Sequence, residues 1–128
     1  MELTLRAIAL VTVGGALGAP LRFTLTVLVN RALSQPAFPA ATLAINATGS
    51  FLLALVFWAS ASRLGPDARL LIGTGLLGAY TTYSTFSVET VQLVERSRPV
   101  LAAGYVAATV ALCLGAAYLG MQLVRSAT

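Results

Sequence analysis

Residues 73–87, with the sequence GTGLLGAYTTYSTFS, decide how this chain folds. Gly73, Gly75 and Gly78 disfavour a continuous helix, and the hydroxyl side chains that follow compete for its backbone hydrogen bonds. We therefore expect a helix break near residues 78–84. Within lipid, a broken backbone is tolerated only where protein or a water-filled cavity covers it, so we expect the break to be buried in the assembly. The alternative is that the Ser and Thr side chains merely bond back to their own helix.

The composition places this stretch in a membrane. Of the 128 residues, 58% are hydrophobic and 9% are charged, and the mean hydropathy is +0.87. Soluble domains carry about 25% charged residues, so a soluble enzyme is excluded. A spanning helix needs about 20 apolar residues. The first charge-free run is shorter than this, so the first helix can span the membrane only if it includes Arg22. We predict an all-α membrane protein in a single integral membrane domain, residues 1–128, with four transmembrane helices at about 3–29, 40–61, 69–94 and 99–124.

The reactive side chains are few and exclude several kinds of site. The chain has no histidine and one cysteine, Cys113. It therefore holds no disulfide within one chain, no His-based catalytic pair and no multi-cysteine metal site. The net charge of +4 comes from arginines scattered between apolar runs, so we expect no nucleic-acid partner. We expect a protein that is not an enzyme.

The arginines are nearly balanced across the predicted spans. One membrane side would hold Arg6, Arg63, Arg69 and Arg125, and the other Arg31, Arg96 and Arg98, plus Arg22 if it faces that end. Orientation normally follows an excess of Lys and Arg in cytoplasmic loops. With almost no excess, we expect dual topology and an antiparallel homodimer about a two-fold axis in the membrane plane. The alternative is one topology, fixed by a small bias.

Two stripes of polar residues fall inside predicted spans, with a spacing that places each stripe on one helix face. They are Thr42, Asn46 and Ser50 on the second helix, and Tyr105, Thr109 and Cys113 on the fourth. Polar groups in lipid are costly and are candidates for function. The alternative is that they join helices by hydrogen bonds.

The polar groups of the membrane runs favour an anion as ligand. Amide and hydroxyl groups donate hydrogen bonds, and an aromatic edge carries the positive end of the ring quadrupole. Tyr83 and Phe86 are three residues apart, on one helical face, and could meet an anion edge-on. Glu89 is the only acid between Asp67 and Glu95. Core packing is the alternative interpretation of the aromatic pair.

Three stretches of the chain resemble a known family. They are residues 14–23 (GGALGAPLRF), 46–51 (NATGSF) and 75–89 (GLLGAYTTYSTFSVE). The chain resembles the small dual-topology fluoride channels of bacteria, archaea and lower eukaryotes. The resemblance implies an antiparallel homodimer with two fluoride pathways, as a multi-pass protein among the lipids of the plasma (inner) membrane. Hydrogen fluoride enters cells neutral and ionises inside, so a passive leak for fluoride protects the cell.

The resemblance also implies roles for individual residues. Asn46, Tyr83 and Phe86 match the family's pathway asparagine and pathway phenylalanines, and Glu89 matches a glutamate near the pathway. Arg22 matches an arginine at a vestibule. Further polar groups implied for the pathway are the hydroxyls of Ser84 and Thr85 and a polar track containing Thr42, Tyr105 and Thr109.

The resemblance further implies a structural sodium ion on the dimer axis, bound by the backbone carbonyls of Gly78 and Thr81. Two positions depart from the family pattern. Tyr83 stands where phenylalanine is usual, and Cys113 stands where a hydroxyl is typical.

Two other functions fit a chain of this size. A small dual-topology multidrug exporter needs a central membrane carboxylate, and the first predicted helix has only Glu2, at its margin. A non-conducting scaffold or regulatory subunit needs no polar stripe aligned with a broken helix. A fluoride-efflux assay in liposomes separates all three.

Overall fold

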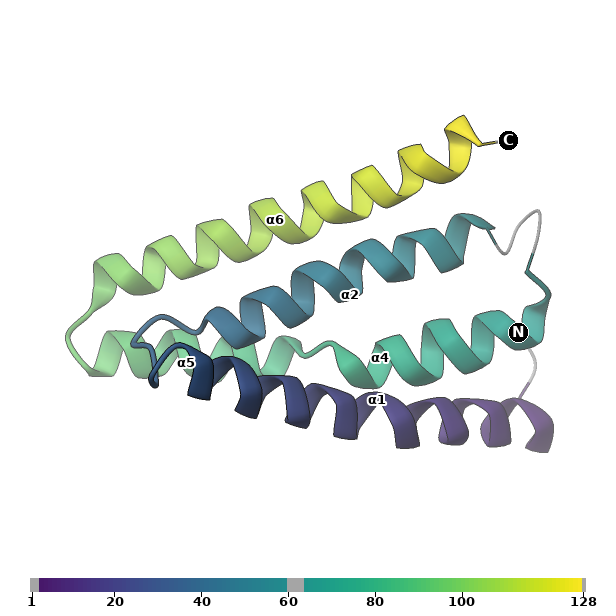
Figure 1. Ribbon diagram of the computed structural model, residues 1–128, viewed down its shortest axis with the longest axis horizontal. Coiled ribbons are helices and arrows are strands. Elements are labelled where there is room, and N and C mark those ends of the chain that lie inside the picture. Colours follow the sequence, from purple (N-terminus) through teal and green to yellow (C-terminus); the bar gives the residue numbers. More distant parts are fainter. Residues whose placement is uncertain (1–2, 60–63, 128) are drawn as a thin grey trace.

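The fold is all-α throughout the part of the chain that the computed structural model describes, residues 3–59 and 64–127. Figure 1 shows the long helices lying lengthwise beside one another. In chain order the elements are α1 (Leu5–Ala32), α2 (Ala40–Ala59), α3 (Pro66–Ala68), the π-helix η1 (Arg69–Leu77), α4 (Gly78–Tyr80), α5 (Tyr83–Glu95) and α6 (Pro99–Ser126).

Three helices, α1, α2 and α6, are long and apolar enough to cross a membrane. The third predicted span corresponds to the elements from α3 to α5. The described ends of the chain and the start of α3 lie at one end of the bundle, and the links 33–39 and 96–98 lie at the other (Figure 1). This is the arrangement that the count of arginines assumed. The protein is therefore a multi-pass membrane protein.

The predicted break in the third span is confirmed. α4 ends at Tyr80, and Thr81 and Thr82 are extended, with φ/ψ of −80°/158° and −152°/111°. α5 then resumes at Tyr83, and Figure 1 shows the interruption between α4 and α5. The alternative also holds in part, because the Thr81 hydroxyl donates to the Leu77 carbonyl and the Ser87 hydroxyl to the Tyr83 carbonyl.

The helix ends differ from prediction by a few residues. α1 and α6 continue to Ala32 and Ser126, past the predicted ends at 29 and 124. The third span begins at Pro66 rather than 69, because proline suits the first helical turn, where its missing N–H costs nothing. α2 ends at Ala59, and the last two residues of its predicted range lie outside the described residues.

Glycines bring α1 against the first half of the broken span. A Cβ on Gly14 would overlap the Leu71 carbonyl oxygen, and one on Gly18 would overlap that of Leu76. Gly75 faces them, and a Cβ there would lie 2.8 Å from the Val11 carbonyl oxygen. Small residues let helix backbones approach closely in membranes. Gly14 and Gly18, four residues apart on one face of α1, therefore pack directly against backbone carbonyls of η1.

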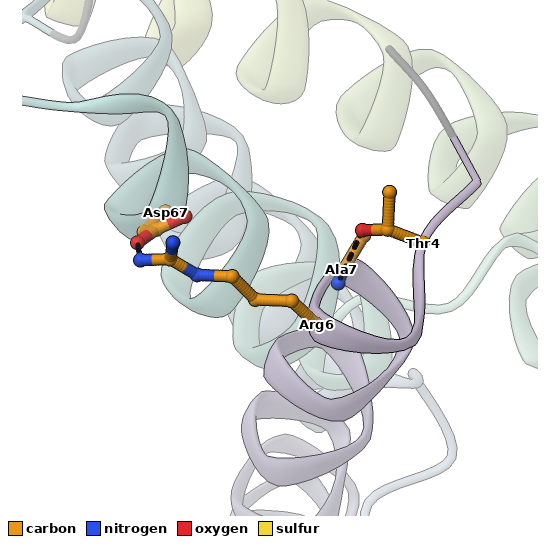
Figure 2. A network of polar contacts seen from close by, with 4 residues as sticks. All are labelled: Thr4, Arg6, Ala7 and Asp67. Carbon is orange, nitrogen blue, oxygen red and sulfur yellow. Dashed lines mark hydrogen bonds and ion pairs between the residues drawn. The ribbon is translucent and has the colours of Figure 1, made fainter.

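An ion pair also joins α1 to the first half of the broken span, at one end of the bundle. Figure 2 shows the Arg6 guanidinium in an ion pair with the Asp67 carboxylate, which links the start of α1 to α3. In the same view the Thr4 hydroxyl accepts a hydrogen bond from the Ala7 N–H at 3.1 Å and caps α1. The Arg6 side chain is 77% exposed and that of Asp67 46%, so solvent screens the ion pair and it adds little stability.

Candidate anion pathway

Asn46 fastens α2 to the helix break. Its Nδ2 donates to the Thr82 carbonyl at 2.9 Å, and its Oδ1 accepts from the Thr82 N–H at 2.8 Å. Both residues are buried, Asn46 to 9% exposure and Thr82 to 7%. A side-chain amide thus supplies the donor and the acceptor that an extended residue in lipid lacks. We refer to this pair of bonds as the clasp.

The clasp was not predicted. The sequence predicted Asn46 as a donor to an anion, whereas in the structure one of its N–H groups and its carbonyl oxygen bind the backbone of Thr82. The side chain retains a second N–H for a ligand. Thr82 was not among the predicted site residues, although its place between the glycines and Ser84 was a usable signal.

Two backbone carbonyls lose their helical donors at the break. In a continuous helix the Thr82 N–H would bond to the Gly78 carbonyl, and the Thr85 N–H to the Thr81 carbonyl. Instead the Thr82 N–H goes to Asn46, and the Thr85 N–H goes to the Thr82 hydroxyl at 3.2 Å. The carbonyls of Gly78 and Thr81 are the two that the resemblance implies for sodium.

Three hydroxyls gather at the start of α5. Thr82 Oγ1 donates to Thr85 Oγ1 at 2.9 Å and lies 3.3 Å from Ser84 Oγ. Ser84 and Thr85 are exposed in the single chain, as a ligand-facing group would be. The N-terminus of a helix also carries a partial positive charge. The predicted hydroxyls therefore lie where the backbone already favours an anion.

An aromatic row extends from α5 to α6. The rings of Tyr83 and Phe86 are 5.6 Å apart between centroids, at 49°, so the two share a face as their spacing predicts. Phe86 lies 5.2 Å from the Tyr105 ring, which meets the Phe38 ring edge-on at 5.5 Å. Phe38 lies in the α1–α2 link, where no sequence signal indicated it.

The two polar stripes meet at Glu89. Its Oε1 accepts from the Thr42 hydroxyl at 2.8 Å, and its Oε2 accepts from the Tyr105 hydroxyl at 2.7 Å. Helices α2, α5 and α6 each contribute one of these residues. Glu89 thus joins α5 to both polar stripes through two hydroxyl groups.

Two cavities flank Thr82. The first, of about 360 Å³, is lined by side chains that include Asn46, Thr82, Tyr83, Phe86, Thr109 and Cys113. The second, of about 300 Å³, is lined by side chains that include Arg22, Thr26, Thr42, Thr82 and Thr85. We refer to them as the aromatic cavity and the arginine cavity. Seven of the ten residues predicted for the pathway line one cavity or the other, and Thr82 lines both; Ser84, Glu89 and Tyr105 line neither.

Thr109 and Cys113 of the α6 stripe line the aromatic cavity. Thr109 is 7% exposed, and its hydroxyl is the one buried side-chain polar atom without a partner among the described residues. Cys113, one turn further on, is partly buried. On α2, the Ser50 hydroxyl is turned back to the Asn46 carbonyl at 2.7 Å. Asn46 and Thr109 therefore supply polar groups to this cavity from opposite helices.

The chain matches one protein family over most of its length. Residues 9–121 match the family described as CrcB-like protein, Camphor Resistance (CrcB). The Fluoride-specific ion channel FluC of Anaeromyxobacter dehalogenans is 46% identical over 118 residues, which cover 91% of this chain and 93% of that protein. The protein of the same name from Shewanella amazonensis is 44% identical, with 91% and 94% covered. That of Oceanobacillus iheyensis is 41% identical, with 93% and 92% covered.

Proposed function

The chain belongs to the CrcB-like protein family, and from this membership we propose that it is a fluoride-specific ion channel that exports fluoride passively and so protects the cell. The observation that carries the proposal is the identity of 41–46% to proteins of that name over about nine-tenths of the chain. The arrangement of donors around the helix break supports it.

The donors suit a small, strongly hydrated anion. A pathway for fluoride must replace its water with close donors, and hydroxyl and amide groups form short bonds to a charged acceptor. Asn46, which has one N–H left over from the clasp, and Thr109, whose hydroxyl has no partner among the described residues, both line the aromatic cavity. The rings of Tyr83 and Phe86 keep that cavity narrow, so a larger halide gains less from each donor.

Charge around the break is arranged to tolerate an anion. The Glu89 carboxylate would repel one, but both of its oxygens are held by hydroxyl donors. Arg22 lies on the other side, in the arginine cavity, where a positive charge would attract an anion. An anion passing Thr82 would move between the two chambers.

Efflux from proteoliposomes tests this function. We expect the purified protein to release fluoride, read on an ion-selective electrode, and to release chloride far more slowly. A multidrug exporter would instead couple protons to organic cations, and a scaffold subunit would release neither halide. Equal rates for chloride and fluoride would contradict the proposal.

We further propose that the channel is an antiparallel homodimer with dual topology. The near-even arginine count supports it, as does the aromatic cavity, whose lining residue Tyr83 is 80% exposed in the single chain. A Ser34→Cys variant in a Cys113→Ser background places one thiol in the exposed α1–α2 link. An impermeant thiol reagent should label it from both sides of the membrane. Labelling from one side only would refute dual topology.

We also propose that a sodium ion is bound where the break meets the dimer axis. The Gly78 and Thr81 carbonyls have each lost a helical donor, and neutral carbonyl oxygens suit a monovalent cation better than a transition metal. Two carbonyls are too few for a site, so both subunits would contribute. The melting temperature in detergent should rise when N-methylglucamine is exchanged for sodium. A melting temperature unaffected by sodium would count against the site.

A further inference from the structure

The hydroxyl of Tyr83 differs from those of the other three tyrosines. Tyr80 bonds to the Thr48 hydroxyl at 3.0 Å, Tyr105 to Glu89 at 2.7 Å, and Tyr118 to Gln122 at 2.6 Å. Within residues 3–59 and 64–127, no partner is found for the Tyr83 hydroxyl, and its side chain is 80% exposed. The Tyr83 phenol is therefore available to form a hydrogen bond with a group outside the single chain.

The place of this hydroxyl makes an unmet bond costly. Tyr83 opens α5, directly after the break, near the middle of the third span. A hydroxyl transferred from water to an apolar surrounding without a hydrogen bond loses several kcal/mol in hydrocarbon reference solvents. In the assembled protein this hydroxyl therefore needs an acceptor, which is an anion, water or the second subunit.

A second residue that lines the aromatic cavity also has a hydroxyl without an acceptor among the described residues. Thr109 lines it together with Tyr83, and its buried hydroxyl finds no acceptor among the described residues. The hydroxyl of Ser50, in the same lining, is already bonded to the Asn46 carbonyl. Tyr83 and Thr109, from two helices, thus line one cavity with hydroxyls that have no acceptor among the described residues, and an anion is an acceptor for both.

We infer that the Tyr83 hydroxyl donates a hydrogen bond to the transported anion in the aromatic cavity, with Thr109 as a second donor. This inference rests on the proposed channel function and assigns a role to the phenol oxygen itself. A phenylalanine at this position offers only its ring edge. Tyr83 therefore raises the affinity of the pathway for a small anion that accepts short hydrogen bonds.

The Tyr83→Phe variant separates the hydroxyl from the ring. The ring can keep its contact with Phe86, so the fold is retained while one hydrogen bond to a charged acceptor is lost. We expect the fluoride concentration that gives half-maximal flux to rise roughly tenfold, as for the loss of such a bond. Because a weakly held anion leaves sooner, the maximal flux should not fall. Thr109→Val, which keeps the side-chain shape, should shift half-saturation in the same direction.

Tyr80→Phe is the matched control. It removes a phenol oxygen three residues away whose partner is the Thr48 hydroxyl, and it should leave half-saturation unchanged. Half-saturation of Tyr83→Phe within twofold of the parent would overturn the inference while the proposed function stands. Loss of the dimer in Tyr83→Phe would also overturn the inference, since the hydroxyl would then bond to the second subunit. A parent protein that releases no fluoride would overturn both.

Discussion

Replacing Asn46 by Leu tests whether the clasp holds the broken span. The two side chains are of similar size, so the substitution removes both hydrogen bonds to Thr82 and leaves little cavity. It leaves the N–H and the carbonyl of Thr82, a residue that is only 7% exposed, without hydrogen-bond partners. Each buried, unsatisfied backbone group costs about 1–3 kcal/mol. We therefore expect a loss of about 2–6 kcal/mol in the free energy of unfolding, twice the cost of one group.

The free energy of unfolding is measured by titrating SDS into detergent micelles that contain the protein. Hydrogen exchange reports on the clasp directly, because the Thr82 amide should exchange faster once Asn46 Oδ1 is gone. Fluoride efflux should be lost with it, since Thr82 separates the two cavities.

Ser50→Ala is the matched control, one turn further along α2. The Ser50 hydroxyl bonds back to a carbonyl of its own helix, so its removal should change the free energy of unfolding by less than about 0.5 kcal/mol. An Asn46→Leu protein with the stability of this control and unchanged exchange at Thr82 would refute the reasoning. The clasp would then contribute nothing to the break.

Three further substitutions, the first with a matched control, test the packing and the pathway. Gly18→Ala places a Cβ against a backbone carbonyl of η1 and should lower the free energy of unfolding by about 1–3 kcal/mol. The control Gly15→Ala has room for its Cβ and should lower it by less than about 0.5 kcal/mol. Equal losses would contradict the close packing. Tyr105→Phe removes one of two donors to Glu89 and should cost about 1.5–3 kcal/mol in the same titration, with no change as the opposing result. Phe86→Ile removes the ring edge and should slow fluoride efflux roughly tenfold while the protein stays folded; parental efflux would exclude Phe86 from the pathway.

Local sequence patterns and composition were sufficient to predict the long helices and the break in the third span. Charge-free runs of spanning length predicted the long helices, because hydrocarbon excludes charge whatever the tertiary structure is. The break near Thr81 followed from local preferences of Gly, Ser and Thr. These features depend on residues close together in the chain or on the lipid around them.

The partners of the polar residues were decided by tertiary structure alone. Spacing placed Thr42 and Asn46 on one helix face but did not indicate what that face meets. In the fold Thr42 meets Glu89, 47 residues away, and Asn46 meets Thr82, 36 residues away. How a helix is rotated and how far it slides along its neighbour depend on side chains of all the helices packing at once. For this reason Asn46, predicted from sequence as a ligand for an anion, is used by the folded chain first to hold its own broken backbone.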